Sequence, residues 1–235
     1  KSNLKSTMDF AMQKAIFEGI SENENWNTGL IKIYESLSND FYYEDPGSLL
    51  VFNDNHDMSR IYTQMKEDIS KTKMAVGLML ILPRIPQILY GTEILMQDTA
   101  KPGDHGLIRS DFPGGWNNDQ TNAFTGKNLK KDQLEMQNYL KTVLNFRKKS
   151  KAIHSGKTLH YAPINGIYVI SRKNDDETVL CIINKNNFDK ELNLDRFHEL
   201  KINNTILTEI YTGEKFIWKD KITLKKNSSI ILTNK

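Results

Sequence analysis

Cysteine is nearly absent from this chain, and so is any strong excess of charge. The 235 residues include one cysteine, Cys181, so no internal disulfide can form. Its place in the apolar stretch 178–183 predicts a buried thiol rather than a nucleophile. The formal net charge is only +3, and the lysines are scattered along the chain, which gives no argument for nucleic-acid binding.

Long hydrophobic runs are also missing. The most apolar stretch, 74–82, is about half the length that a membrane-spanning helix needs, and Pro83 ends it. No glycine-rich phosphate loop, zinc-binding pattern or serine or cysteine triad motif is present. No signal peptide is visible either. Because the chain begins with Lys1 rather than methionine, we expect the true N-terminus to lie upstream.

The hydrophobic pattern changes character near residue 155. Before it, short apolar stretches alternate with helical periodicity, which is typical of parallel strands joined by crossover helices. Here the expected strands are 7–10, 49–53 and 87–90, and the expected helices are 11–20, 29–38, 71–82 and 135–149. Beyond it, short runs and turn signals predict an antiparallel β-sandwich. Its expected strands are 158–161, 167–172, 178–184, 205–210, 216–218, 222–224 and 229–233.

The most informative stretch follows the second expected strand. A polar cluster, Asn53-Asp54-Asn55-His56-Asp57, comes directly after the apolar run 49–52. In parallel α/β folds, functional groups lie just beyond the C-terminal ends of the strands. A histidine and an aspartate side by side at such a place can bind one polar ligand from two directions. The alternative is that Asn53, Asp54 and Asp57 cap turns or the next helix.

Several stretches together resemble the α-amylase superfamily of glycoside hydrolases, in particular its cyclomaltodextrinase and neopullulanase-like members. Residues 52–57 with Arg60 are similar to the end of that family's seventh barrel strand, 7–10 to its sixth and 85–93 to its eighth. The stretch 103–116 is similar to the loop after the eighth strand. The matches run in the family's order through most of the chain.

The resemblance implies a fold and a division of the chain. Residues 1–154 would be the C-terminal part of a catalytic TIM (β/α)8 barrel, its strands six to eight, and residues 155–235 a C-terminal antiparallel β-sandwich. Three such units cannot close an eight-stranded barrel. We therefore expect a fragment whose missing N-terminal part belongs to the same protein, with apolar surface exposed on strand six and on the helices that face absent neighbours.

The resemblance also implies site residues. Family members use three carboxylates, and Asp57 matches the third, which holds the sugar ring beside the scissile bond, with His56 as its partner. The nucleophile and the general acid would lie upstream of Lys1, so this chain alone should be inactive. Asp104 and Arg109 would line sugar subsites, and Tyr90 and Trp116 are candidates for stacking on sugar rings. Arg60 is expected to support the Asp57 region structurally.

No organic cofactor is implied, and no metal site is expected in this chain. The run 53–57 is rich in Asp and Asn but lacks the glycine and the trailing glutamate of an EF-hand loop. Calcium remains open for the full-length enzyme, because family calcium sites draw mostly on regions upstream.

The sequence therefore predicts a retaining glycoside hydrolase that acts on α-glucans such as starch, maltooligosaccharides, cyclodextrin or pullulan. One alternative is a transglycosylase or isomerase of the same superfamily, and another is a non-catalytic, sugar-binding relative. The substrate class favours a periplasmic or extracellular location and leaves a cytoplasmic one open. Linkage preference and oligomeric state are not defined by the sequence.

Overall fold

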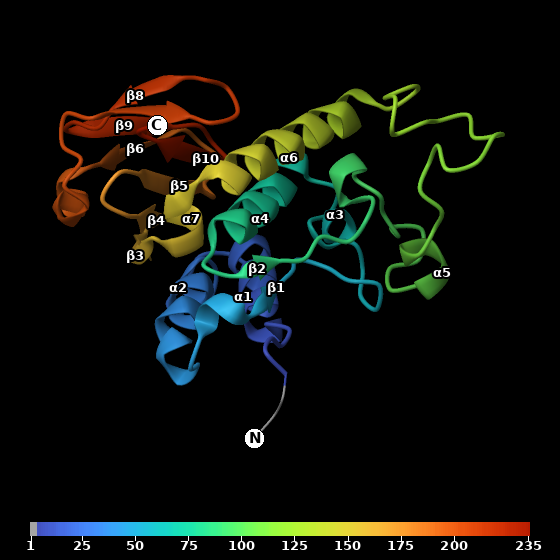
Figure 1. Cartoon of the computed structure of the whole chain (residues 1–235), viewed down its shortest axis with the longest axis horizontal. Helices are drawn as coiled ribbons and strands as arrows, with labels where there is room; N and C mark the ends of the chain where they lie inside the picture. Colours follow the sequence, from blue (N-terminus) through green and yellow to red (C-terminus); the bar gives the residue numbers. More distant parts are fainter. Residues whose placement is uncertain (1–3) are drawn as a thin grey trace.

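Three parallel segments lie at the centre of the N-terminal half. The computed structural model describes residues 4–235, and Figure 1 shows the arrangement of its elements. Strand β1 (Leu50–Val51) pairs in parallel with β2 (Ile85–Pro86), and Met8 forms a parallel bridge to Leu50 on the other side of β1. The order in space therefore follows the order in sequence, as expected of successive βα units.

Helices connect and cover these segments. The longer ones are α1 (Phe10–Ser21), α2 (Ile31–Ser38), α4 (Ile69–Ile81) and α6 (Lys131–Lys149). Short α3 (Ile61–Gln64), α5 (His105–Ile108) and α7 (Lys151–Ser155) and 3-10 turns η1 (Asn39–Tyr42), η2 (Pro46–Ser48) and η3 (Thr92–Ile94) lie between them. Helix α1 begins where it does because the Asp9 carboxylate accepts a hydrogen bond from the Met12 N–H at 2.9 Å.

The four helices expected from periodicity are confirmed, with ends shifted by up to four residues. The expected strand 7–10 is wrong in length: only Met8 forms a bridge, because Asp9 already caps α1. The eighth strand lies earlier than expected, at Ile85–Pro86. The N–H groups of Ile85 and Gln87 donate to Leu49 and Val51 at 2.9 and 2.8 Å. Pro86, which has no N–H, therefore sits where none is needed for this pairing.

The C-terminal third of the chain consists of β-strands and one 3-10 segment. A six-stranded antiparallel sheet has the order β3-β4-β5-β10-β7-β8, and a second sheet pairs β6 with β9. Their bounds are β3 Lys157–Ile164, β4 Ile167–Lys173, β5 Thr178–Asn184, β6 Lys190–Asn193, β7 Ile206–Glu209, β8 Lys215–Ile217, β9 Lys221–Leu224 and β10 Ser228–Thr233. All seven expected strands are present. Strand β6 and the 3-10 segment η4 (Asp195–Leu200) were not expected.

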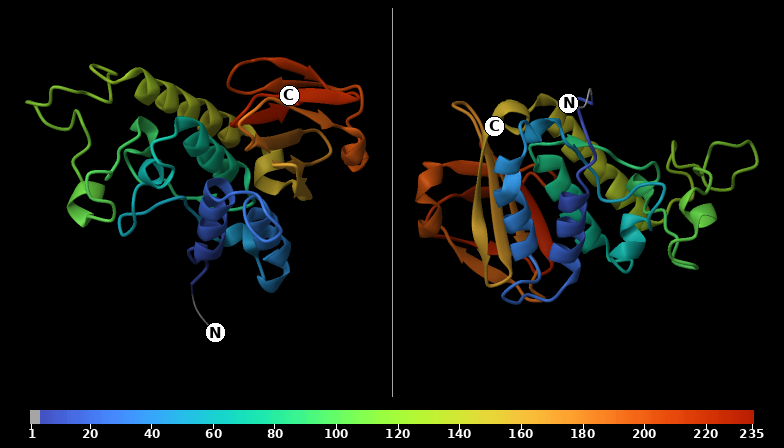
Figure 2. Two further views of the ribbon diagram at one scale, coloured as in Figure 1. Left: turned by 180° about the vertical axis from the view of Figure 1, so that it is seen from behind. Right: turned by 90° about the horizontal axis from the view of Figure 1, so that it is seen from below.

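The large sheet is buried on both faces at β4 and β5. One face, which carries Tyr168, Ile170 and Cys181, shares a core with α1, α2 and α4. The opposite face, with Val169 and Ile182, packs on the smaller sheet and η4. Figure 2 shows the helices stacked against one side of the sheet. Cys181 is fully buried, as expected, and burial raises the pKa of its thiol to about 12.

Within residues 4–235 the parallel segments form an open sheet and do not close into a barrel. Apolar side chains are exposed beside them: Phe10 is 56% exposed, Ile85 46% and Met8 36%. The expected exposed apolar surface at strand six is therefore present. None of the helices that the structure describes combines the length and the apolar character needed to span a bilayer.

Candidate functional site

Side-chain exposure changes from buried to mostly exposed within a few residues after the end of β1. Asn53, Asp54 and Asn55 are buried, whereas the side chains of His56 and Asp57 are 64% and 60% exposed. The Asp57 N–H donates to the Asn55 side-chain oxygen at 2.8 Å, which forms a local turn of the kind that Asn favours. This turn holds His56 and Asp57 at the rim, beyond the C-terminal end of the strand.

The Asp57 carboxylate is the centre of a small cluster formed by one arginine and two histidines. Arg109 donates from Nη2 to Asp57 Oδ1 at 2.7 Å and from Nε to the His56 carbonyl oxygen at 3.0 Å. The His56 Nε2 lies 3.2 Å from Asp57 Oδ2, and the His105 Nδ1 lies 4.0 Å from Oδ1. The structure thus brings together three of the six residues singled out from the sequence: His56, Asp57 and Arg109. All three remain open to solvent.

Arg60 is buried beneath this cluster and connects the segments that carry it. Its side chain is fully buried and donates to the carbonyl oxygens of Ile108 and Tyr90, and its guanidinium lies 4.9 Å from the centre of the Tyr90 ring. One side chain therefore ties the segment after β1 to the segments after β2. The structural role expected of Arg60 is confirmed.

Asp54 is the buried acid of the motif. Its carboxylate accepts the N–H of Ile61 at 2.6 Å, at the start of α3. Burial is the largest cause that raises the pKa of Asp54, to about 6. Because its carboxylate oxygen is occupied by the hydrogen bond from Ile61, Asp54 has a structural role. Asp57, three residues later, is exposed instead.

Asp104 has a different position from Asp57. It caps α5, accepting the N–H groups of Gly106 and Leu107 at 2.9 and 3.2 Å, and it pairs with Lys101 at 2.9 Å. The bond from Lys101, followed by the backbone bonds, lowers the pKa of Asp104. No contact among the described residues joins Asp104 to Asp57. It holds the short helix from which His105 and Arg109 reach the carboxylate.

The two aromatic candidates lie on the same loop system. The Tyr90 hydroxyl donates to the Ser110 carbonyl oxygen at 2.9 Å. Trp116 is 67% exposed, and its Nε1 donates to Asp111 at 3.2 Å. Phe112 instead packs edge-on against Phe124 at 5.1 Å between ring centres, in agreement with a packing role. The loop projects from the side of the molecule away from the β-sheets (Figure 1).

His105 was not found by reasoning from the sequence. The signal was available, because His105 and Arg109 are four residues apart and share one face of a single helical turn. No group of three or more His, Cys, Asp or Glu side chains among residues 4–235 is placed to hold a metal ion.

Parallel βα units with a His-Asp pair beyond the end of β1, followed by an antiparallel β domain, define an α/β protein with a C-terminal β domain. The model of the α-amylase catalytic domain matches residues 1–151, and that of the cyclo-malto-dextrinase C-terminal domain matches residues 158–233. Because the first match covers more than half of the chain, the protein belongs to the α-amylase family.

Individual relatives agree with this assignment. The chain is 26% identical over 181 residues to the cyclomaltodextrin glucanotransferase of Thermoanaerobacterium thermosulfurigenes, covering 77% of this chain and 22% of that protein. It is 25% identical over 248 residues to alpha-amylase 3 of Dictyoglomus thermophilum, covering 97% of this chain and 47% of that protein. The chain therefore spans from about a fifth to about a half of the length of these relatives.

Solved structures show the same fold. The α-amylase of Geobacillus thermoleovorans in complex with acarbose superposes with a TM-score of 0.75 at 20% identity, over 98% of this chain and 48% of that one. An α-amylase of Anoxybacillus superposes with a TM-score of 0.75 at 21% identity, over 98% of this chain and 47% of that one.

Proposed function

We propose that the protein acts on α-glucans as a retaining glycoside hydrolase in which Asp57 stabilises the transition state and His56 assists it. The observation that carries the proposal is the exposed Asp57 carboxylate, held at the end of β1 by Arg109 and His56 in a chain of the α-amylase family. Relatives named α-amylase and maltogenic α-amylase support the substrate class.

The chemistry follows from the geometry of this carboxylate. Glycoside cleavage passes through an oxocarbenium-like transition state, and hydrogen bonds to sugar hydroxyls that strengthen there lower the barrier. An ionised Asp57 accepts such bonds, and charge-assisted bonds are the stronger class. Arg109 fixes one carboxylate oxygen, which orients the group and leaves its exposed edge for the sugar. His56 adds a second polar group on the same side.

The nucleophile and the general acid are proposed to come from residues outside the described part of the protein. A retaining enzyme needs two carboxyl groups about 5–5.5 Å apart, flanking the scissile bond. In this proposal Asp57 is neither of these two groups, because its role is to hold the sugar in the transition state. On this proposal the described residues alone do not hydrolyse glucans. No cofactor is part of it.

The loop after β2 is proposed to line the sugar subsites. Trp116 presents an exposed ring on which a sugar can stack, and Tyr90 presents a partly exposed one. Arg109 contacts the sugar region directly beside Asp57. Asp104 contributes by capping α5 and thereby positioning Arg109.

Glycosyl transfer is a second candidate function, favoured by one observation. Relatives in the comparison include cyclomaltodextrin glucanotransferases. A transferase and a hydrolase would use Asp57 in the same way and differ in whether an acceptor sugar or water completes the reaction. Product analysis with maltoheptaose and a labelled glucose acceptor separates them. A third candidate, a non-catalytic sugar-binding relative, would release no product.

Reducing-sugar release tests the proposal directly. The complete protein and its Asp57→Asn variant are compared on maltoheptaose, β-cyclodextrin and pullulan, with Asp175→Asn, a change in an exposed β-sandwich turn, as the matched control. We expect kcat/KM to fall roughly 10³-fold or more for Asp57→Asn only, a loss of about 4 kcal/mol of transition-state stabilisation. Equal activity of both variants would refute the role of Asp57. Complete inactivity of the wild-type protein would favour the non-catalytic candidate.

A further inference from the structure

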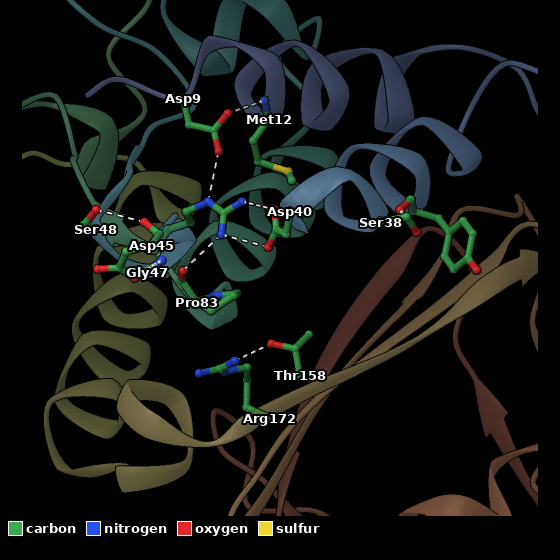
Figure 3. Close-up of polar contacts among 12 residues, drawn as sticks. Asp9, Met12, Ser38, Asp40, Asp45, Gly47, Ser48, Pro83, Thr158 and Arg172 are labelled. Carbon is green, nitrogen blue, oxygen red and sulfur yellow. Dashed lines mark hydrogen bonds and ion pairs between the residues drawn. The ribbon is translucent and has the colours of Figure 1, made fainter. Parts of the chain in front are cut away.

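A pocket of about 580 Å³ lies at the opposite end of the parallel strands from His56 and Asp57. It opens between the βα units and the large sheet, where the chain enters β2. Its lining includes Asp40, Pro83, Arg84, Arg147, Thr158 and Arg172. Figure 3 shows Asp40 and Pro83 on one side and the Thr158–Arg172 pair on the other. Three arginines from three different parts of the chain therefore meet at one pocket.

Only one of these arginines is neutralised by acids. Arg84 pairs with Asp9, Nε to Oδ2 at 3.0 Å, and with Asp40. Arg147 donates to the carbonyl oxygens of Leu80 and Arg84, and Arg172 to Thr158 Oγ1 and the Ile153 carbonyl oxygen. Within the described part of the chain, neither Arg147 nor Arg172 forms an ion pair with a carboxylate. The pocket thus holds two buried cations whose partners are neutral.

Arg172 also has an unused donor. The residue is only 3% exposed, and its Nε is buried without a hydrogen-bond partner among residues 4–235. A buried donor left unpaired on a charged group is unfavourable, because the group has lost its water and gained no partner. Burial, together with the charges of Arg147 and Arg84, lowers the pKa of Arg172 to about 10. A negative charge beside this guanidinium would offset both the burial and the repulsion from Arg147 and Arg84.

We propose that this pocket binds a small oxyanion, with the chemistry of a phosphate or sulfate group. Guanidinium groups present several N–H donors in one plane and match the oxygens of such anions better than a lysine does. An anion here would offset the charges of Arg147 and Arg172, which line the pocket without a carboxylate partner among the described residues. Arg147 lies in α6 and Arg172 in β4, so the bound anion would join the helices to the sheet.

Thermal unfolding with inorganic phosphate tests the proposal. Phosphate is titrated against sodium chloride at equal ionic strength, and the phosphate concentration that gives half of the rise in Tm is measured. We expect phosphate to raise Tm more than chloride does. The half-maximal concentration should increase about tenfold or more for Arg172→Met, because a charge-assisted hydrogen bond is lost. Arg196→Met, at an exposed arginine of the β-sandwich, is the matched control and should leave it unchanged.

Two further measurements keep the result decisive if Arg172→Met fails to fold. Arg172→Lys retains the charge but loses the planar donors, and the same weakening is expected. Crystals of the wild-type protein soaked in tungstate should show anomalous density in this pocket, within hydrogen-bonding distance of the Arg172 guanidinium. Tungstate elsewhere, or a phosphate effect no larger than that of chloride, would overturn the proposal. A parallel titration with glucose 1-phosphate identifies the kind of anion that the pocket prefers. A half-maximal concentration lower than that of phosphate indicates a sugar phosphate. An equal or higher half-maximal concentration indicates a free inorganic anion.

Discussion

Both ends of the parallel strands carry an aspartate–arginine pair, and the two pairs differ in their surroundings rather than in their geometry. At the rim, Arg109 contacts Asp57 at 2.7 Å, and both side chains are about half exposed. At the opposite end, Arg84 contacts Asp9 at 3.0 Å, and their side chains are 1% and 3% exposed. The first pair is available to a ligand and contributes little to stability. The second pair is buried, and the loss of either partner would leave an uncompensated buried charge.

The same contrast appears within one motif. Within residues 53–57, Asp54 is buried and accepts a hydrogen bond from a backbone N–H, whereas Asp57 is exposed at the end of the segment. Two aspartates three residues apart therefore have different tasks. The four substitutions below test whether buried polar groups determine stability while exposed ones serve the proposed binding of substrate.

The largest effect on stability is expected from Arg84→Met. Without the guanidinium, the buried Asp9 carboxylate loses its charged partner, and we expect the free energy of unfolding to fall by about 3–5 kcal/mol. Arg109→Met removes a pair of similar length at the exposed rim and should cost less than about 1 kcal/mol. Urea denaturation followed by circular dichroism measures both. Equal losses would show that burial does not distinguish the two ends.

Asp54→Asn tests the buried acid through pH. The pKa of Asp54 is about 6 in the folded protein, above the value of about 3.9 for an unfolded aspartate. Between these values the folded state binds more protons than the unfolded state, so this group lowers stability as pH rises. The loss amounts to about 3 kcal/mol by pH 7. The asparagine amide does not titrate, so the variant should gain on the wild-type protein from pH 4 to 7 in urea titrations. A difference that stays constant over this range would contradict the raised pKa.

Asn53→Leu tests a buried polar side chain that has no hydrogen-bond partner among the described residues. The two polar side-chain atoms of Asn53, Oδ1 and Nδ2, are buried and lack a hydrogen-bond partner among residues 4–235. Replacement by leucine should raise the free energy of unfolding by about 1–3 kcal/mol, because an unpaired polar group leaves the interior. The control, Asn184→Leu, removes an amide that donates to the Lys225 carbonyl oxygen at 2.9 Å and should be destabilising. A loss of stability at Asn53 as well would contradict the view that its amide is an unfavourable unpaired group.

The smallest effect on stability is expected from Trp116→Ala. The exposed ring makes little contact with the core, so the free energy of unfolding should change by less than about 0.5 kcal/mol. If the ring stacks on sugar, KM for maltoheptaose should rise about three- to tenfold, as expected for the loss of up to about 1.4 kcal/mol of binding. Phe112→Ala, which removes a ring packed into the same loop, should instead lower stability. An unchanged KM for Trp116→Ala would remove it from the substrate-binding site.

Regular elements with a strong apolar period were predictable from the sequence. The stretch 178–184 forms β5 with the expected ends, and α6 follows the apolar face expected in the stretch 135–149. Strand β6 was missed because Lys190–Asn193 contains only one apolar residue and is held by its pairing with β9. The expected strand at 7–10 was too long because the Asp9 side chain prefers to cap a helix there.

The place of His56 and Asp57 at the end of a strand was also predictable, because an apolar run followed by polar residues marks where a buried strand ends. The cluster around Asp57 was predictable only in part. Arg109 comes from 52 residues further along the chain, and His105 joins it only because Asp104 caps a single helical turn between them.

The sequence by itself determined the elements with a strong apolar period, the burial of Cys181, and the place of His56 and Asp57 at a strand end, because local periodicity and composition control these features. Tertiary structure alone decided which arginines and aspartates are buried, paired or left without a partner. Arg84 meets Asp9 across 75 residues and Asp40 across 44. The cost of removing a charge from water depends on every neighbour that surrounds it, and those neighbours come from segments whose proximity no local pattern encodes.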